Sequence, residues 1–244
     1  MRIVYWNIRA GGGKRIEAIY EQLLKWRPDV IGLCEYRATP ASIWLGEALA
    51  KEGWGFQLNA ASAKTPAVNA VMLASRTPLT SVHLRPQPPE PRRWLFGRLE
   101  CGLCVGVMHA PNFVTGRKKP YFDAILDFAR RWRGGAAVIG GDTNTGVPPL
   151  DGNAAAFHAW EWEWVHQLAR FGWADAFRTL HGQTTAHTWY SPNAGNGYRL
   201  DQAYVNKQCL PSLTEAKYLW GSAHPGQRRD GLSDHAALIV DLAR

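Results

Sequence analysis

Seven polar side chains that can bind a metal ion or move a proton stand beside the most hydrophobic runs of this sequence. They are Asn7, Glu35, Asp142, Asn144, Asp201, Asp234 and His235. A carboxylate at the end of a buried strand is costly unless it is paired or bound to a metal. Asp and Asn also cap turns, but that role does not account for all seven at once. An oxygen-rich set of this kind suits Mg²⁺ or Mn²⁺ better than zinc.

A strand, a polar loop, a helix and a second strand follow one another twice, and both copies end on a carboxylate, Glu35 and Asp142. The expected elements of the two copies are strands over 2–8, 30–34, 94–109 (bent near Gly97) and 136–139, and helices over 16–24 and 121–132. Open α/β sheets hold ligands at the carboxyl edge of their strands, so we expect the site there. Other expected elements are helices over 42–51 and 154–171 and strands over 68–74, 187–191, 199–205, 217–220 and 236–242.

Length and composition predict a single domain over residues 1–244, with 46% hydrophobic residues and no long linker. No run of about 18 apolar residues occurs, which argues against a membrane span. Four scattered cysteines and the lack of an apolar export signal predict a cytoplasmic location. We also expect a monomer.

The charge balance favours an anionic partner. Lys and Arg number 28 against 20 Asp and Glu, a net charge of +8. Nucleic acid is the first candidate because basic side chains displace its counterions. A surface charge that only keeps the protein soluble is the alternative.

Five short motifs, in order along almost the whole chain, resemble those of the endonuclease/exonuclease/phosphatase superfamily, and most closely its exonuclease III and abasic-endonuclease branch. They are Trp6-Asn7-Ile8, Leu33-Cys34-Glu35, Gly141-Asp142-Thr143-Asn144, Arg199-Leu200-Asp201 and Ser233-Asp234-His235. The resemblance implies an α/β four-layer sandwich of two packed mixed β-sheets flanked by helices. It also implies Mg²⁺-dependent hydrolysis of a phosphate ester.

The resemblance also implies a role for each site residue. Asn7 and Glu35 would hold the metal ion, with Asp234 in or beside its shell. Asp142 and Asn144 would position or deprotonate the attacking water. His235 would contact the scissile phosphate or act as an acid or base, and Asp201 would orient it. Such a reaction needs an aligned nucleophile and neutralisation of the developing oxyanion.

Two positions depart from the abasic-endonuclease pattern. Arg9 stands where many of those enzymes carry an acidic residue, which favours one Mg²⁺ or Mn²⁺ ion rather than two. His109 stands where Tyr is usual and resembles the deoxyribonuclease-I side of the superfamily, which makes it a candidate general acid. A hydrogen-bond donor to phosphate is the alternative for His109. Asn112 matches a phosphate-contacting Asn.

Further residues are candidates for substrate binding. Arg117, Lys118 and Lys119 would contact backbone phosphates, or they form a solvated helix start. Trp189 and Tyr198, with the neighbouring Arg199, would line a pocket for a flipped-out abasic sugar, although core packing explains the two aromatic residues equally well. Trp160 and Trp164 share a helix face, which favours core packing over a surface for stacking bases.

These features predict a Mg²⁺-dependent nuclease that hydrolyses DNA, as an endonuclease or 3′-exonuclease, with abasic sites among its targets. The alternative is a phosphoesterase for a small or lipid-linked phosphate ester, although the sequence offers no apolar loop for a membrane. A non-catalytic nucleic-acid binder is disfavoured because Glu35, Asp142 and His235 are all present.

Overall fold

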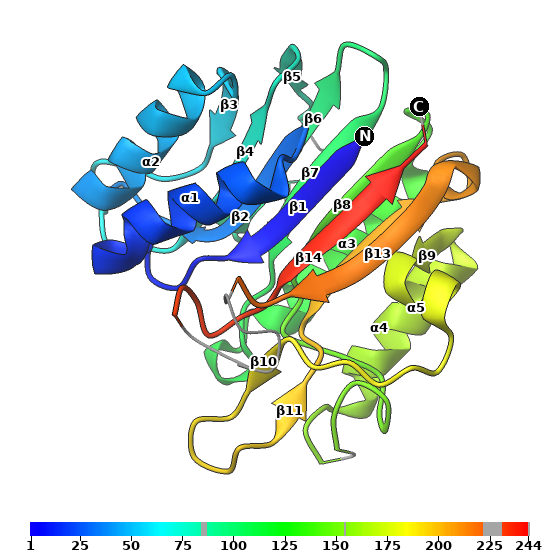
Figure 1. Cartoon of the computed structure of the whole chain (residues 1–244). Coiled ribbons are helices and arrows are strands. Elements are labelled where there is room, and N and C mark those ends of the chain that lie inside the picture. Colours follow the sequence, from blue (N-terminus) through cyan, green and yellow to red (C-terminus); the bar gives the residue numbers. More distant parts are fainter. Residues whose placement is uncertain (84–86, 154, 222–230, 244) are drawn as a thin grey trace.

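Two six-stranded mixed sheets pack face to face and are flanked by helices in a computed structural model (Figure 1). The structure describes residues 1–83, 87–153, 155–221 and 231–243. The first sheet has the order β13-β14-β1-β2-β4-β3. Its strands are β1 (Arg2–Asn7), β2 (Val30–Tyr36), β3 (Phe56–Asn59), β4 (Ala70–Ser75), β13 (Leu213–Leu219) and β14 (Ala237–Leu242).

The second sheet has the order β5-β6-β7-β8-β12-β9, and a separate hairpin pairs β10 with β11. The strands of the second sheet are β5 (Leu79–Ser81), β6 (Trp94–Leu99), β7 (Cys104–His109), β8 (Ala137–Asp142), β9 (Trp173–Asp175) and β12 (Asp201–Asn206). The hairpin strands are β10 (Trp189–Tyr190) and β11 (Gly197–Tyr198). β1 and β2 run parallel, as do β7 and β8.

Helices cover the outer face of each sheet, which makes four layers and confirms the predicted fold class (Figure 1). They are α1 (Ile16–Trp26), α2 (Pro40–Lys51), α3 (Lys118–Arg131) and α4 (Ala159–Arg170). A further short helix, α5 (Ala176–His181), instead contributes Ala176 and Phe177 to the core between the sheets. Four single 3₁₀ turns are η1 (Gly13–Arg15), η2 (Pro91–Arg93), η3 (Phe113–Thr115) and η4 (Leu210–Ser212). No helix among the described residues is both long enough and apolar enough to cross a bilayer.

The layers follow from the alternation of side chains along each strand. In β1, Ile3 and Tyr5 point into the core between the sheets, and Trp6 packs against the helices outside. The Tyr5 ring lies so close to the backbone of both sheets that a Cβ at Gly32 or Gly140 would come within 2.7 or 2.6 Å of it. Glycine at these two positions therefore lets the two sheets pack closely on either side of the Tyr5 ring.

Several elements differ from the sequence-based expectation. The bend in segment 94–109 falls at 100–103, where Gly102 has a φ of 89°, and Gly97 stays inside β6. The helix expected over 154–171 begins only at Ala159, and its expected first residue lies outside the described ones. The short elements β3, β5, β9, β11 and α5 were not predicted, because two to six residues carry too little periodicity.

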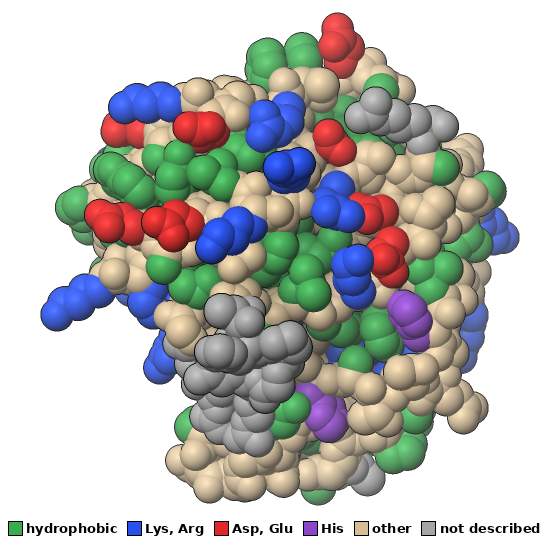
Figure 2. Space-filling view, in the orientation of Figure 1, with side chains coloured by type: hydrophobic (Ala, Val, Ile, Leu, Met, Phe, Trp, Pro, Cys, Tyr) green, Lys and Arg blue, Asp and Glu red, His purple; other side chains and the backbone are tan. Residues whose placement is uncertain are grey.

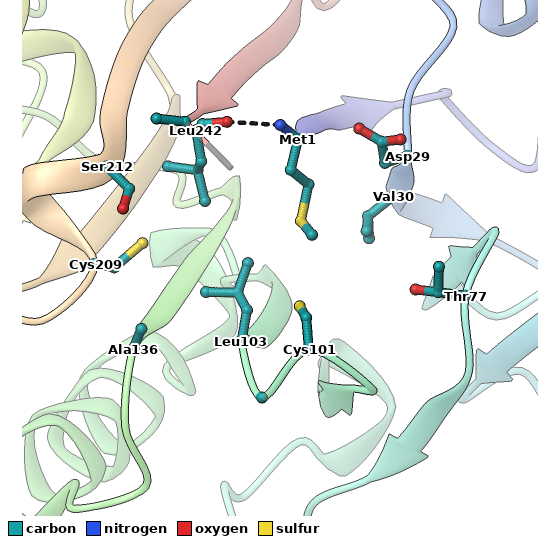
Figure 3. A pocket seen from close by; sticks show the side chains of 12 residues that line it. Met1, Asp29, Val30, Thr77, Cys101, Leu103, Ala136, Cys209, Ser212 and Leu242 are labelled. Atoms are coloured by element: carbon teal, nitrogen blue, oxygen red, sulfur yellow. Dashed lines mark hydrogen bonds between the residues drawn. The ribbon is translucent and has the colours of Figure 1, made fainter.

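The amino ends of the central strands converge on a cleft of about 800 Å³ (Figure 3). Met1, Val30, Leu103 and Ala136, which stand at the starts of β1, β2, β7 and β8, line it. On one wall of the cleft the terminal amine of Met1 donates a hydrogen bond to the Leu242 carbonyl of the neighbouring strand at 2.6 Å. This cleft thus lies at the end of the strands opposite to the predicted catalytic residues.

Candidate active site

Four polar side chains meet where the central parallel strands end. Asn7 ends β1, His109 ends β7 and Asp142 ends β8. Glu35 is the last residue but one of β2. Asp142 is paired in register with His109 of β7 on one side and with Asp201 of antiparallel β12 on the other. The strand order therefore brings residues from distant parts of the chain to one edge.

Asn7 links the two sheets through its side-chain amide. Its Nδ2 donates to Asp142 Oδ2 at 2.9 Å and to Glu35 Oε1 at 3.3 Å. Its Oδ1 accepts from the backbone N–H of Arg9 at 3.0 Å. Asn7 and Asp142 are only 1% and 2% exposed, so this part of the bridge is shielded from bulk water, whereas Glu35 is half-buried.

Glu35 reaches the site because its backbone is unusual. It has a φ of 59° and lies at a bulge where the pairing of β2 with β4 shifts between Cys34 and Tyr36. A bulge re-aims a side chain at the cost of local strain, and such strain is concentrated at functional sites. Glu35 Oε2 accepts from the Ala10 backbone N–H at 2.6 Å, which fixes the carboxylate beside the β1 loop.

His235 and Asp201 form a buried pair beside Asp142. His235 Nδ1 lies 2.9 Å from Asp201 Oδ2, and its Nε2 lies 4.0 Å from Asp142 Oδ2. Burial alone would lower the pKa of His235, but the carboxylates of Asp201 and Asp142 raise it to about 10. His235 is thus charged at neutral pH and presents an Nε2–H toward Asp142.

Asp142 has an environment suited to a proton acceptor near neutral pH. Burial and the nearby Asp201 raise its pKa to about 7, although His235 opposes the shift. Asp142 Oδ1 accepts from the Asn144 backbone N–H at 2.9 Å. Asn144, with a φ of 50°, directs its Nδ2 to the Ala110 carbonyl at 2.8 Å. The Gly141 Cα lies so close to β7 that a Cβ would sit 2.1 Å from the Met108 carbonyl oxygen.

His109 lies on the other side of Asp142, with its Nε2 3.7 Å from Asp142 Oδ2. Arg93 Nη1 lies 3.1 Å from His109 Nδ1, and because arginine can only donate, Nδ1 accepts. Burial, together with the charges of Arg93 and His235, lowers the pKa of His109 well below its usual range. His109 is therefore a neutral ring with its proton on Nε2, which favours hydrogen-bond donation over the transfer of a proton from an imidazolium.

Potential metal ligands lie close together in the buried cluster. Among the described residues, Asp142, Asp201 and His235 offer ligand atoms within 4.8 Å of one another. Asp234 Oδ1 is buried and has no hydrogen-bond partner among the residues that the structure describes. The other carboxylate oxygen of Asp234, Oδ2, lies 3.7 Å from Arg9 Nε. An unpartnered carboxylate oxygen is the group that a cation would satisfy.

The structure corrects the expectation for Lys118. This residue begins α3 on the same face as Tyr121 and Phe122 and is only 3% exposed. Its Nζ pairs with Glu161 Oε1 and donates to the Asn144 carbonyl at 2.5 Å. Lys118 therefore cannot reach a substrate phosphate, and it instead holds the loop that follows Asp142.

The structure also corrects the expectation for Arg199. Its guanidinium is 1% exposed, donates to both oxygens of Asp151 at 2.7 and 2.9 Å, and reaches Asp175 Oδ2 at 2.7 Å. This fully paired cation ties the segment before β12 to α5 and to the loop after β8. Arg199 is thus a buried structural residue in this fold and makes no surface for substrate.

The other substrate-binding candidates stay accessible. Trp189 and Tyr198 face each other across the β10–β11 hairpin with ring centroids 5.9 Å apart, and they line a hollow of about 260 Å³ with Asn144 and Phe157. The side chains of Arg117 and Lys119 are 61% and 62% exposed and pair with Glu90 and Asp123. Asn112 is exposed at the start of η3.

Three residues near the site escaped the sequence analysis: Arg93, Glu90 and Glu161. Glu90 is only 7% exposed and pairs with both Arg93 and Arg117. Glu161 is 1% exposed. The sequence signal for these three residues is their position next to bulky apolar residues. That position does not indicate which charged partner each of them contacts in the fold.

Charged side chains are interspersed on the face shown in Figure 2, where Lys and Arg alternate with Asp and Glu and form no single basic patch. On this face, therefore, the positive charge has no single focus.

Comparisons with known proteins agree with this architecture. The sequence profile described as "Endonuclease/Exonuclease/phosphatase family" matches residues 4–235. A search of curated protein sequences finds no match. Among solved structures, a 3′-5′ exonuclease (NExo) from Neisseria meningitidis is similar at 22% identity with a TM-score of 0.83, covering 100% of both chains.

Two further solved structures are similar to the chain. A structure of the 3′ phosphatase NExo from Neisseria, bound to a product DNA hairpin, matches at 22% identity and a TM-score of 0.82 over 100% of both chains. An AP endonuclease from Archaeoglobus fulgidus matches at 17% identity and a TM-score of 0.82 over 99% of both chains. At these identities the similarity shows a shared fold.

Proposed function

Because this chain belongs to the endonuclease/exonuclease/phosphatase family, whose members are metal-dependent phosphoesterases, we propose that it is a Mg²⁺-dependent nuclease that hydrolyses DNA phosphodiester bonds. The observation that carries this proposal is the buried arrangement of Asp142 between Asn7 and the His235–Asp201 pair. It combines a proton acceptor, a fixed cation and oxygen ligands at one edge of the fold. These are the groups that phosphodiester hydrolysis requires.

We assign the acceptance of the water proton to Asp142. Its pKa of about 7 lies close to neutral pH, and a general base is most effective when its pKa is near the pH of the reaction. The amide of Asn7 and the backbone N–H of Asn144 fix its two oxygens, so the carboxylate needs no reorganisation before it accepts the proton. Asn144 would help to orient the same water.

His235 would donate a hydrogen bond to the phosphoryl oxygen on which negative charge develops. Its pKa of about 10, which Asp201 and Asp142 maintain against burial, keeps the ring charged. Asp201 fixes the ring through Nδ1 and leaves Nε2–H for the phosphate. The Nε2–H of His109 would donate to a second oxygen of the same group.

The donors at the edge of β1 and β2 fit one divalent ion. Asn7, Glu35 and Asp234 supply only oxygen ligands, and the buried Oδ1 of Asp234 has no other partner among the described residues. When bound, Mg²⁺ or Mn²⁺ would neutralise charge on the scissile phosphate. We place the ion on this side rather than among Asp142, Asp201 and His235, because a protonated imidazole cannot ligate a metal.

A DNA substrate is supported by the surroundings of the site. The hollow between Trp189, Tyr198 and Phe157 opens beside Asn144 and suits the sugar of a nucleotide. The accessible cations Arg117 and Lys119 and the amide of Asn112 follow directly after β7. A similar fold has been observed with a DNA hairpin bound.

End-labelled single-stranded, duplex and abasic oligonucleotides, incubated with Mg²⁺ and resolved by length, test the proposal. We expect shorter products that vanish in EDTA and return with Mg²⁺ or Mn²⁺. Products shortened from the 3′ end would identify an exonuclease, and one internal cut at the abasic position an abasic endonuclease. Intact oligonucleotides, together with phosphate released from a small or lipid-linked phosphate ester, would refute the proposal.

A further inference from the structure

Three aromatic rings form an accessible cluster on the loop side of the candidate active site. Phe113 of η3 is 51% exposed, and its ring centroid lies 4.2 Å from that of His158. The His158 ring is nearly parallel to that of Trp160, at 7° and 6.3 Å, and Phe113 lies 6.5 Å from Trp160. We call these three residues the aromatic platform.

One ring of the platform, that of Trp160, is held by the buried core. Trp160 packs edge-on against Phe122 at 6.0 Å, and Phe122 stacks on the buried Trp164 at 4.1 Å. A ring supported in this way keeps its orientation, so it can bind a flat ligand without losing much side-chain entropy.

The platform is also linked to the catalytic edge. The backbone N–H of His158 donates to Glu161 Oε2 at 2.8 Å, and Glu161 Oε1 pairs with Lys118. Lys118 donates to the Asn144 carbonyl, and Asn144 binds Asp142. A ligand on the platform would therefore lie at a fixed place relative to Asp142.

The neighbours of the platform narrow the class of ligand. Val114 is 86% exposed beside Phe113, and Arg117 follows in the same segment with 61% of its side chain exposed. Phe157, which precedes His158 in the sequence, lines the hollow beside Asn144. Together, exposed rings, a cation and a sugar-sized hollow match the base, phosphate and sugar of an unpaired nucleic-acid strand.

We propose that the aromatic platform stacks an unpaired base of the substrate strand, next to the nucleotide whose phosphate lies at Asp142. This inference rests on the proposed nuclease function and deepens it, because the platform would make the enzyme prefer strands with unpaired bases. Stacking on aromatic side chains accepts any base, so we expect a preference for strandedness and none for sequence.

Binding of a fluorescein-labelled single-stranded oligothymidine in EDTA, followed by anisotropy, tests this without turnover. We expect Phe113→Ala to weaken binding roughly 5- to 100-fold, the range for loss of one stacked base. Phe113→Trp should bind like the unaltered protein, and Phe113→Leu should not. Phe171→Ala, which removes a 38%-exposed ring just after the far end of α4, is the matched control and should bind normally.

Oligonucleotides that lack one base at a time locate the contact. One abasic position should weaken binding to the unaltered protein and leave binding to Phe113→Ala unchanged, because the stacking partner is already missing. Melting temperatures of all variants within a few degrees of the unaltered protein would show that the fold is kept. If the abasic position weakened binding equally in the unaltered protein and in Phe113→Ala, the base-stacking role of the platform would be overturned.

The remaining outcomes separate the platform from the nuclease function. DNA hydrolysis with equal oligothymidine binding by Phe113→Ala and the unaltered protein would overturn the platform and leave the nuclease function standing. If Phe113→Ala weakens oligothymidine binding but the unaltered protein hydrolyses no DNA, the nuclease function would be overturned and the base-stacking role of the platform would stand. Vesicles of phosphatidylcholine and phosphatidylserine test Phe113 and Val114 as a membrane contact, and vesicle binding lost in Phe113→Ala, with oligothymidine binding unchanged, would overturn the base-stacking assignment.

Discussion

The amino and carboxyl ends of the central strands β1, β2, β7 and β8 differ in polarity and in backbone conformation. At the amino ends, Met1, Val30, Leu103 and Ala136 surround a cleft lined mainly by apolar groups. At the carboxyl ends, buried polar groups are crowded, and Glu35 and Asn144 have left-handed backbone conformations.

The difference shows how the fold separates stability from chemistry. Buried charges such as Asp142 are unfavourable by themselves, and their pKa shifts are signs of that cost. Apolar strands that continue to the opposite end contribute the burial that offsets it. We therefore expect substitutions of the polar residues at the carboxyl ends to change activity with little loss of stability. Substitutions of the apolar residues at the amino ends should change stability with little effect on activity.

The largest effect is expected for Asp142→Asn, which keeps the shape of the side chain and removes its ability to accept a proton. We expect kcat on DNA to fall by about 10³-fold or more, since a positioned base and its electrostatic contribution are lost together. The melting temperature at pH 8 should not fall, because a buried carboxylate with a raised pKa is replaced by a neutral amide. A large drop in melting temperature would break the proposed separation.

The pair His235–Asp201 should act as one unit. His235→Ala and Asp201→Asn should each lower kcat by about 10²- to 10³-fold, and the double variant should be little worse than His235→Ala alone. Single-turnover kinetics on one labelled oligonucleotide would measure all three. Losses that multiply in the double variant would refute the orienting role of Asp201.

His109 distinguishes a hydrogen-bond donor from a general acid. A hydrogen bond to a charged group is worth about 1.5–3 kcal/mol, so we expect His109→Ala to lose roughly 10- to 100-fold on DNA. A nitrophenyl phosphodiester should lose a similar factor, because the neutral ring held by Arg93 does not protonate the leaving group. Substantial recovery on the nitrophenyl ester would instead identify His109 as the general acid.

The pH dependence follows from Asp142 and His235 with opposite signs. Asp142 must be unprotonated, so kcat/KM should rise with pH up to its pKa of about 7 and fall about tenfold per unit below it. His235 must be protonated, so kcat/KM should fall again above its pKa of about 10. Because Asp142 and His235 interact, the two apparent pKa values of the profile describe the pair rather than either residue alone. A profile with no acidic limb down to pH 5 would exclude Asp142 as the base.

The smallest effect on activity is expected at the amino ends. Ala136→Leu would place apolar atoms in the cleft and should raise stability by up to about 1 kcal/mol, or 2–4 °C in melting temperature, with kcat unchanged. The same change at the opposite end, Ala110→Leu, is the matched contrast. Ala110 is fully buried beside Asp142 and Asn144, so overpacking there should lower both stability and activity.

Much of the fold could be predicted from the sequence because its central strands are continuous apolar runs. The strands expected over 2–8 and 30–34 appear as β1 and β2, and the polar residues that follow such runs do gather at one edge. The single domain, the cytoplasmic location and the roles of individual residues stay predictions.

The errors concern partners that only tertiary structure supplies. Lys118 was grouped with Arg117 and Lys119 as a basic run, but α3 begins one turn earlier than expected and turns Lys118 inward toward Glu161, 43 residues away along the chain. Arg199 likewise meets Asp151 across 48 residues. Local spacing says which residues share a face, and it does not say which distant charge will lie opposite.

The active site draws on both ends of the chain, because β1 pairs with β14 and Trp6 Nε1 donates to the His235 carbonyl at 3.0 Å. During synthesis the loop that carries Asp234 and His235 emerges more than 220 residues after Asn7. A nascent chain that already displays Asn7, Glu35 and Asp142 therefore has no charged imidazole to complete the cluster. Under the proposed function, catalytic competence would arise only when β14 closes the first sheet, so we expect a ribosome-bound or truncated chain to be inert toward the nucleic acid around it.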